Sequence, residues 1–291
     1  MEKFKSIHAM LSIVFAMLLS SCINSISDED AESVPTCRLT INVGQLVSEI
    51  PMPSTRAAIT LADNTKSITV WAVGEDGQVK QSVNQSSIDP GYGSISMELP
   101  AADYTIVAVA HNGAQAAYTS GIISFADNKV TDTFIGKADV SISSTTPQST
   151  SITLRRRVAK LTVRMDDALP TNVKQAKATI SGYSPKFDLN NDRGTEAEEL
   201  VRTIDLTGRD GQTAISVTIY TFVPSDPHTT SLTYTVTNTS DAVLYNGTFP
   251  SLSLVECTQT LVFGTFFAYN NVWTLDLIGD WETPIDYNIN D

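Results

Sequence analysis

The sequence predicts an all-β fold made of two tandem β-sandwich domains. Apolar residues recur at every second position in short segments, which Gly, Pro, Asn and Asp separate. No window of eleven residues carries an apolar stripe with helical spacing. Beyond the N-terminal region, about 260 residues remain, which is enough for two domains of ordinary size.

Each alternating segment predicts a strand with one buried face and one solvated face rich in Thr and Ser. The expected strands contain residues 39–43, 68–72, 95–99, 104–110, 138–142, 161–165, 215–219, 232–236, 261–263 and 273–277. Segments 171–177 and 196–200 lack this alternation, and we expect short helical turns there at most.

The alternation changes phase near the middle of the chain. Apolar residues are even-numbered at Ile152 and Leu154 but odd-numbered at Leu161 and Val163, with arginines at 155–157 between them. A strand cannot change phase without a bulge or a passage to another sheet. We therefore place the domain junction here. We expect the arginine triplet to be an interdomain or edge feature that discourages aggregation, rather than an anion site.

The N-terminus predicts export and lipidation. Lys3 and Lys5 precede an apolar run at 10–19 that is too short to span a bilayer. The run ends in Leu-Ser-Ser-Cys22, which looks like a bacterial lipobox. Acylation of Cys22, for example by palmitate, would hold the protein at the outer membrane, because two or three acyl chains bind almost permanently. The alternative is an ordinary signal peptide with a chance cysteine.

These observations give the expected organisation along the chain. It comprises a signal peptide at 1–21, a lipidated acidic tether at 22–35, an N-terminal sandwich at 36–156, a C-terminal sandwich at 157–281 and a tail at 282–291. Removal of residues 1–21 takes away two lysines and one glutamate, which leaves 17 basic and 31 acidic side chains and a charge of −14. That sign argues against nucleic acid as a partner.

The sequence shows no familiar catalytic pattern. His8 leaves with the signal peptide. His111 ends an expected strand beside Asn112-Gly113, His228 follows residues 224–227, and both look like loop residues. No HExxH, GxSxG or phosphate-binding loop occurs, so we expect neither an enzyme nor a cofactor. Cys37 and Cys257 remain after lipidation, either as a disulfide or as two buried free thiols.

One acidic loop matches part of the EF-hand calcium pattern. Asp188, Asn190, Asp192 and Glu199 supply oxygen side chains at loop positions 1, 3, 5 and 12. Position 6 is Arg193, where the sharp turn needs glycine, and no helices flank the loop. We favour a solvated turn, with a calcium site as the weaker alternative.

Four segments, in this order behind the lipobox, resemble the fimbrillin-associated anchor and minor-subunit family of type V pili. They are a strand and turn at 68–77, a proline-turn-tyrosine strand at 99–110, the Arg-Val-Ala-Lys strand at 154–163 and a closing strand from Trp273 to Trp281. Family members are lipoproteins with two transthyretin-like, Greek-key sandwich domains. The usual glycine of the second segment is here Ala102 or Asp103. The resemblance covers most of residues 37–281.

The resemblance implies a surface-exposed structural subunit, an anchor or accessory protein of a fimbria that serves cell adhesion. Such subunits bind neighbouring pilin subunits by β-strand addition. The N-terminal strand with Leu39, Ile41 and Val43 would fill a groove of its own domain. Arg56, in a polar loop after that strand, would be a possible protease-processing site.

The C-terminal tail could supply a donor strand. Ile285, Tyr287 and Ile289 alternate on one face of the expected strand. The alternative is an edge strand that folds onto its own domain.

A competing function is that of a surface glycan-binding lipoprotein. This function would need an exposed aromatic platform, for which Trp71, Trp273 and Trp281 are the available tryptophans. Each lies within or at the end of an expected strand, so packing in the core is the simpler interpretation.

Overall fold

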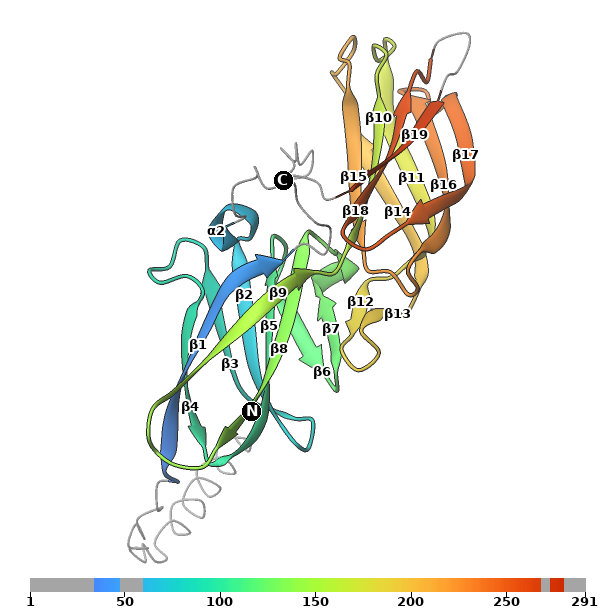
Figure 1. Ribbon diagram of the computed structural model, residues 1–291. Helices are drawn as coiled ribbons and strands as arrows, with labels where there is room; N and C mark the ends of the chain where they lie inside the picture. The colour runs from blue at the N-terminus through green and yellow to red at the C-terminus, as the bar shows by residue number, and fades with distance from the viewer. Residues whose placement is uncertain (1–33, 48–59, 268–272, 280–291) are drawn as a thin grey trace, which may run out of the picture. The chain divides into compact units, whose positions relative to one another are not determined.

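The computed structural model describes residues 34–47, 60–267 and 273–279, and nearly all of the regular secondary structure in these ranges is β-strand (Figure 1). The predicted all-β fold is therefore confirmed. Helical structure in these ranges is limited to α2 at Leu61–Asn64 and a 3₁₀ turn at Ala126–Asn128. No helix among the described residues has the length and apolar character needed to cross a membrane.

The first sandwich is one seven-stranded sheet with the order β3-β2-β5-β8-β9-β1-β4. Its strands are β1 at Thr36–Val47, β2 at Ser67–Gly74, β3 at Val79–Ser86, β4 at Ser94–Pro100, β5 at Ala102–His111, β8 at Thr133–Ile142 and β9 at Gln148–Arg156. Strands β8 and β9 pair only at Phe134–Arg156 and Ile135–Arg155. The sheet therefore divides at this short pairing into two parts.

The two parts of this sheet share one apolar core. Leu39 of β1, Met97 of β4 and Leu154 of β9 come from one part, and Val70 of β2 and Ile106 of β5 come from the other. All are essentially inaccessible to solvent. Burial of each such side chain stabilises the fold by about 1.5–3 kcal/mol.

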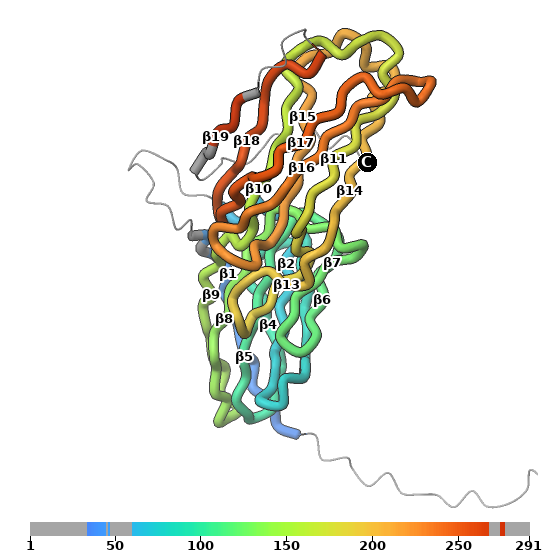
Figure 2. Tube along the Cα trace, turned by 90° about the vertical axis from the view of Figure 1, so that its right-hand side faces the viewer, coloured from blue at the N-terminus to red at the C-terminus, as the bar shows by residue number. Residues whose placement is uncertain are grey.

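Two four-stranded sheets form the second sandwich, with the orders β15-β10-β18-β19 and β14-β11-β16-β17 (Figures 1 and 2). The strands are β10 at Ala159–Met165, β11 at Val173–Tyr183, β14 at Glu198–Asp205, β15 at Ile215–Thr221, β16 at His228–Asn238, β17 at Val243–Leu254, β18 at Thr258–Gly264 and β19 at Trp273–Gly279. In the first of these sheets β10 pairs antiparallel with β15 and parallel with β18.

A fourth, small sheet takes strands from both halves of the chain. Its order is β13-β12-β7-β6, with β6 at Ala116–Thr119, β7 at Ile122–Phe125, β12 at Lys186–Asp188 and β13 at Arg193–Thr195. Phe125 of β7 stacks on Phe222, with the ring centroids 6.2 Å apart. The same core cluster includes Val107 and Val109, so β5 is buried on both faces. This double burial explains the dense apolar run at 104–110.

The phase change in the sequence coincides with a passage between sheets. Strand β9 ends at Arg156, and β10 begins at Ala159 in another sheet. Leu154 belongs to the core of the first sandwich, whereas Leu161 belongs to the second core. The domain limits at 36–156 and 157–281 stay a prediction, because the small sheet and the second core use residues from both ranges.

Two segments that we expected to form helical turns at most are strands. Residues 171–177 enter β11, and residues 196–200 enter β14. These strands pair with each other from Gln175–Asp205 to Tyr183–Glu198. The pairing is interrupted by a register shift between Ile180 and Tyr183, which blurs the alternation in the sequence.

Candidate functional site

Strand β1 lies between β4 and β9 in the first sandwich (Figure 1). It pairs antiparallel with β4 from Thr36–Pro100 to Asn42–Ser94. It also pairs parallel with β9 from Leu39–Gln148 to Val47–Arg155, with a register shift between Val43 and Gln45. Both edges of this N-terminal strand are thus occupied by neighbouring strands.

The side chains of β1 fill the interior of the sandwich. Leu39 and Ile41 are 0% exposed, and Cys37 and Val43 are 1% exposed. Ile95, Met97 and Leu99 of β4 lie in the same core. The structure therefore brings together Leu39, Ile41 and Val43, and all three are buried as a groove-filling strand requires. Their role in assembly stays a prediction.

Close contacts fix β1 near both of its ends. The backbone N–H of Val43 donates to the carbonyl of Gly93 at 2.7 Å. Gly93 has φ of +93°, and a Cβ at this position would lie 2.5 Å from the Val43 carbonyl oxygen, so the contact requires glycine. The thiol of Cys37 donates to the Thr146 carbonyl at 3.0 Å.

The arginine triplet is not a solvent-exposed edge feature, because two of its members are buried. Arg156 is 2% exposed and pairs with Asp132. Arg157 is 9% exposed and forms ion pairs with Glu256, at 2.8 Å, and with Asp192. Burial alone would lower the pKa of Arg157, but the two carboxylates outweigh it and raise that pKa. These arginines hold structural segments together.

The loop with the partial EF-hand pattern uses its carboxylates within the protein. Asp188 accepts hydrogen bonds from the backbone N–H groups of Asn190 and Asn191, at 2.8 and 3.2 Å, and from the Asn191 amide at 2.7 Å. The hydrogen bond from the Asn191 side-chain amide is the largest cause that lowers the pKa of the Asp188 carboxyl group. Asp192 pairs with Arg157, and Glu199 is exposed in β14. Within the described ranges no group of three or more His, Cys, Asp or Glu residues could hold a metal.

Other residues considered from the sequence have mainly structural positions. Trp71 is 5% exposed, as expected for a core residue, and its ring lies 5.8 Å from that of Tyr118. Cys37 and Cys257 are buried and do not form a disulfide with each other. His111 is the last residue of β5, so its expected place at the end of a strand is confirmed, but it is fully buried and does not have the surroundings of a loop residue. His228 begins β16 and contacts the Gly182 carbonyl at 3.1 Å.

A family model for the fimbrillin-A associated anchor proteins Mfa1 and Mfa2 matches residues 35–253, which is well over half of the chain. The chain belongs to this family. No curated protein matches the sequence.

Solved structures similar to this chain come from several bacteria. A protein of Bacteroides thetaiotaomicron VPI-5482, provisionally described as polysaccharide-binding, is 13% identical with a TM-score of 0.52, and the alignment covers 84% of this chain and 99% of that one. The fimbrial anchor protein Mfa2 of Porphyromonas gingivalis is 13% identical with a TM-score of 0.48, over 84% and 100% of the two chains. A fimbrial assembly protein of Parabacteroides distasonis ATCC 8503 is 15% identical with a TM-score of 0.44, over 83% and 94%. At these identities the first likeness shows a shared fold.

Family membership supports a pilus-associated accessory role at the cell surface, since the family model describes fimbrillin-associated anchor proteins. Several residues singled out from the sequence lie outside the described ranges. They are Cys22, Arg56, Trp281 and the tail residues Ile285, Tyr287 and Ile289. Their roles therefore remain predictions from the sequence.

Proposed function

We propose that this protein is a lipid-anchored outer-membrane subunit of a type V pilus, an anchor or accessory protein, which binds a neighbouring pilin by β-strand addition. Membership of the fimbrial anchor family supports the pilus role. The lipobox-like segment ending at Cys22 supports the membrane attachment. The acidic charge of the chain is consistent with protein partners rather than nucleic acid.

The position of β1 is the single observation that carries the strand-addition mechanism. Removal of β1 would leave β4 and β9 with unpaired backbone donors and acceptors along facing edges. It would also open the apolar space that Leu39, Ile41 and Val43 occupy. Backbone pairing along such edges supplies affinity for an added strand, and alternate side chains in the groove supply specificity.

Two states of the protein follow from this arrangement. If a protease cuts after Arg56, β1 can leave and the groove can accept a donor strand from another subunit. If Arg56 stays intact, β1 keeps the groove closed, and the chain can then contribute only a donor strand of its own. The alternating tail residues Ile285, Tyr287 and Ile289 are the candidate donor for that second state.

Deletion of the gene in the source bacterium tests this function. We expect the cells to lose attached fibres, with fibre subunits recovered in the medium, as measured by electron microscopy and immunoblotting of fractions. Wild-type complementation should restore attachment. A Cys22→Ala variant should instead leave the protein in the soluble fraction and the fibres detached, because no acyl chain holds it. Unchanged number, length and attachment of fibres in the deletion strain would rule out the pilus role.

A further inference from the structure

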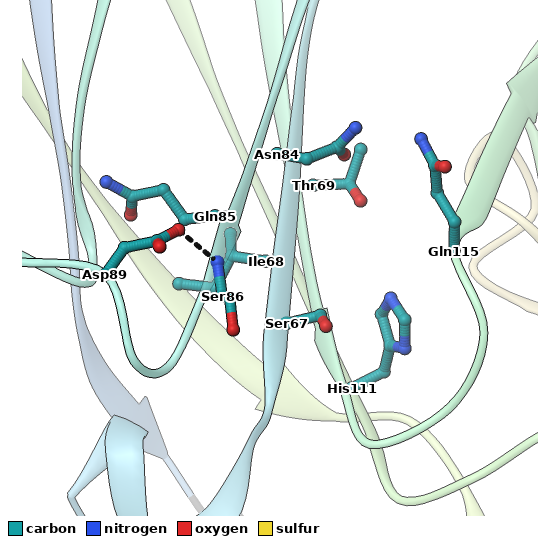
Figure 3. Close-up of a pocket in the computed structure, with 9 residues that line it drawn as sticks. All are labelled: Ser67, Ile68, Thr69, Asn84, Gln85, Ser86, Asp89, His111 and Gln115. Atoms are coloured by element: carbon teal, nitrogen blue, oxygen red, sulfur yellow. Dashed lines mark hydrogen bonds between the residues drawn. The ribbon is translucent and has the colours of Figure 1, made fainter.

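A pocket of about 370 Å³, with several polar side chains in its lining, lies over strands β2 and β3 at the end of β5 (Figure 3). This pocket is separate from the groove that β1 fills between β4 and β9, and the proposed pilus role does not involve it. Six polar side chains that line it carry the argument: Ser67, Thr69, Asn84, Ser86, His111 and Gln115. The volume lies in the range of about 300–1,000 Å³ typical of small-molecule sites.

His111 presents a buried hydrogen-bond donor to this pocket. Its Nδ1 accepts a hydrogen bond from the Gly113 N–H at 3.2 Å, which places the proton of the neutral ring on Nε2. Nε2 is buried and has no hydrogen-bond partner among the described residues. The ring is held edge-on against Phe125, with centroids 5.1 Å apart. Because burial lowers the pKa of His111 to about 4, the ring is neutral at pH 7.

The side chains around His111 are also available to a ligand. Within the described part of the chain, Ser67, Thr69, Asn84 and Gln115 form no side-chain hydrogen bond with the protein. Two further lining residues are engaged elsewhere. The Gln85 amide oxygen accepts from the Gly93 N–H at 2.9 Å, and the Asp89 carboxylate accepts from the Ser86 N–H at 2.7 Å (Figure 3).

The lining chemistry indicates a neutral ligand with several hydroxyl groups. No Lys or Arg lines the pocket, so it lacks the charge-assisted donors that anions require. Hydroxyls and primary amides can both donate and accept, as the hydroxyl groups of a sugar demand. Ile68 is the one apolar lining residue, so the pocket lacks the apolar anchor site that a peptide side chain would fill.

We propose that this pocket binds a neutral saccharide, with His111 Nε2 as a donor and with Thr69, Asn84 and Gln115 as hydrogen-bonding partners of the sugar hydroxyls. The size of the pocket suits a monosaccharide or disaccharide unit of a longer glycan. This site differs from a tryptophan platform, because the side chains that line it include no Trp, Tyr or Phe. The protein would thus recognise a carbohydrate independently of its strand-exchange groove.

Titration of the detergent-solubilised full-length protein tests this site. The probes are D-glucose, D-galactose, D-mannose, N-acetyl-D-glucosamine and lactose. Binding of each sugar is monitored by saturation-transfer NMR and by the NMR resonances of the His111 imidazole and of the Asn84 and Gln115 side-chain amides. We expect saturable binding of at least one sugar, with shifts at these three side chains.

Variants of exposed lining residues make the test specific without disturbing the core. Asn84→Ala and Gln115→Ala should each weaken binding by about three- to tenfold, the effect of one lost hydrogen bond. Asn246→Ala, an exposed residue of β17, serves as the matched control and should bind as wild type. Failure of all five sugars to bind, wild-type affinity in both pocket variants, or binding of a Ser/Asn-rich peptide in place of any sugar would overturn the proposal.

Discussion

Arg156 and Asp132 form a bidentate ion pair in the interior of the protein. The Arg156 Nε donates to Asp132 Oδ1 at 2.8 Å, and Nη2 donates to Oδ2 at 2.9 Å. The two side chains are 2% and 3% exposed, and the guanidinium lies 4.8 Å from the centre of the Phe134 ring. Because Arg156 ends β9 and Asp132 immediately precedes β8, the pair joins these strands where their backbone pairing is short.

Loss of Asp132 should strongly destabilise the protein. Asp132→Ala leaves the guanidinium buried without its carboxylate, which typically costs about 3–5 kcal/mol of unfolding free energy. Urea denaturation measures this loss. The double variant Asp132→Ala/Arg156→Met should be more stable than Asp132→Ala alone, because the guanidinium that lost its carboxylate is also removed. Asp241→Asn, which breaks an exposed ion pair with Lys174 and keeps a side chain that tolerates the φ of +60° at this position, is the control and should keep the wild-type midpoint. A midpoint for Asp132→Ala equal to that control would show that the buried pair is dispensable.

Gly136 is predicted to be essential for the approach of β8 to β9. A Cβ at this position would lie 2.3 Å from the Thr153 carbonyl oxygen and 2.7 Å from Ile152 Cγ2. Gly136→Ala should therefore cost about 1–3 kcal/mol through overpacking, as measured by thermal unfolding. A Cβ added at Gly44 would meet no atom within 4 Å, so Gly44→Ala should leave the melting temperature nearly unchanged. Equal effects of the two substitutions would contradict this account.

Acid should destabilise the fold partly through His111. Its pKa falls from 6.5 to about 4 on folding, because burial disfavours the charged ring. Above pH 6.5 the His111 ring is neutral in both the folded and the unfolded protein, so it does not make the free energy of unfolding depend on pH. Between pH 6.5 and pH 4 the unfolded chain binds a proton that the folded chain does not, so the free energy of unfolding decreases by about 3 kcal/mol as the pH falls.

Urea unfolding at several pH values tests this effect. A His111→Gln variant should lose this part of the pH dependence, whereas His228→Gln should retain it. If His111→Gln shows the same decline in stability as wild type between neutral and acidic pH, His111 is not the group responsible.

The C-terminal tail is predicted to act in assembly rather than in folding. If the tail binds as a strand in a partner's groove, replacement of Ile285, Tyr287 and Ile289 by Ser should weaken the binding free energy by about 1.5–3 kcal/mol for each buried side chain. We expect an almost unaltered monomer melting temperature and a loss of co-assembly with the partner pilin. Replacement of Asp286, Asn288 and Asn290 by Ser, on the opposite face, is the matched control and should preserve assembly. A large fall in the melting temperature would instead place the tail in its own domain.

Strands with one buried face could be predicted from the sequence, whereas strands whose register with a neighbouring strand shifts could not. Leu39, Ile41 and Val43 alternate strictly because β1 contributes one face to the core. In β11 the register with β16 shifts between Val173 and Gln175, so the apolar positions change phase. Such a shift depends on the partner strand, which local alternation does not reveal.

The candidate site was only partly predictable for a similar reason. The alternation identified β1, but not its parallel pairing with β9, which follows about one hundred residues later. The sequence indicates that His111 ends a strand and gives it the look of a loop residue, because Asn112-Gly113 is a typical turn signal. His111 is fully buried, and the ring of Phe125, from the later strand β7, packs edge-on against it. No local pattern could therefore have shown that Ser67, Asn84 and His111 line one pocket.

The parallel pairing of β1 with β9 has a consequence for how the chain folds. During synthesis β1 emerges first, yet its parallel partner follows only after β8. Pairing across such a separation slows folding, because the intervening loop must close before the contacts form. Until then β1 is an apolar strand with at least one open edge, a state prone to aggregation or to capture by another chain. The N-terminal sandwich is thus completed late, and a chain that ends before Gln148 would expose the groove along β1 permanently.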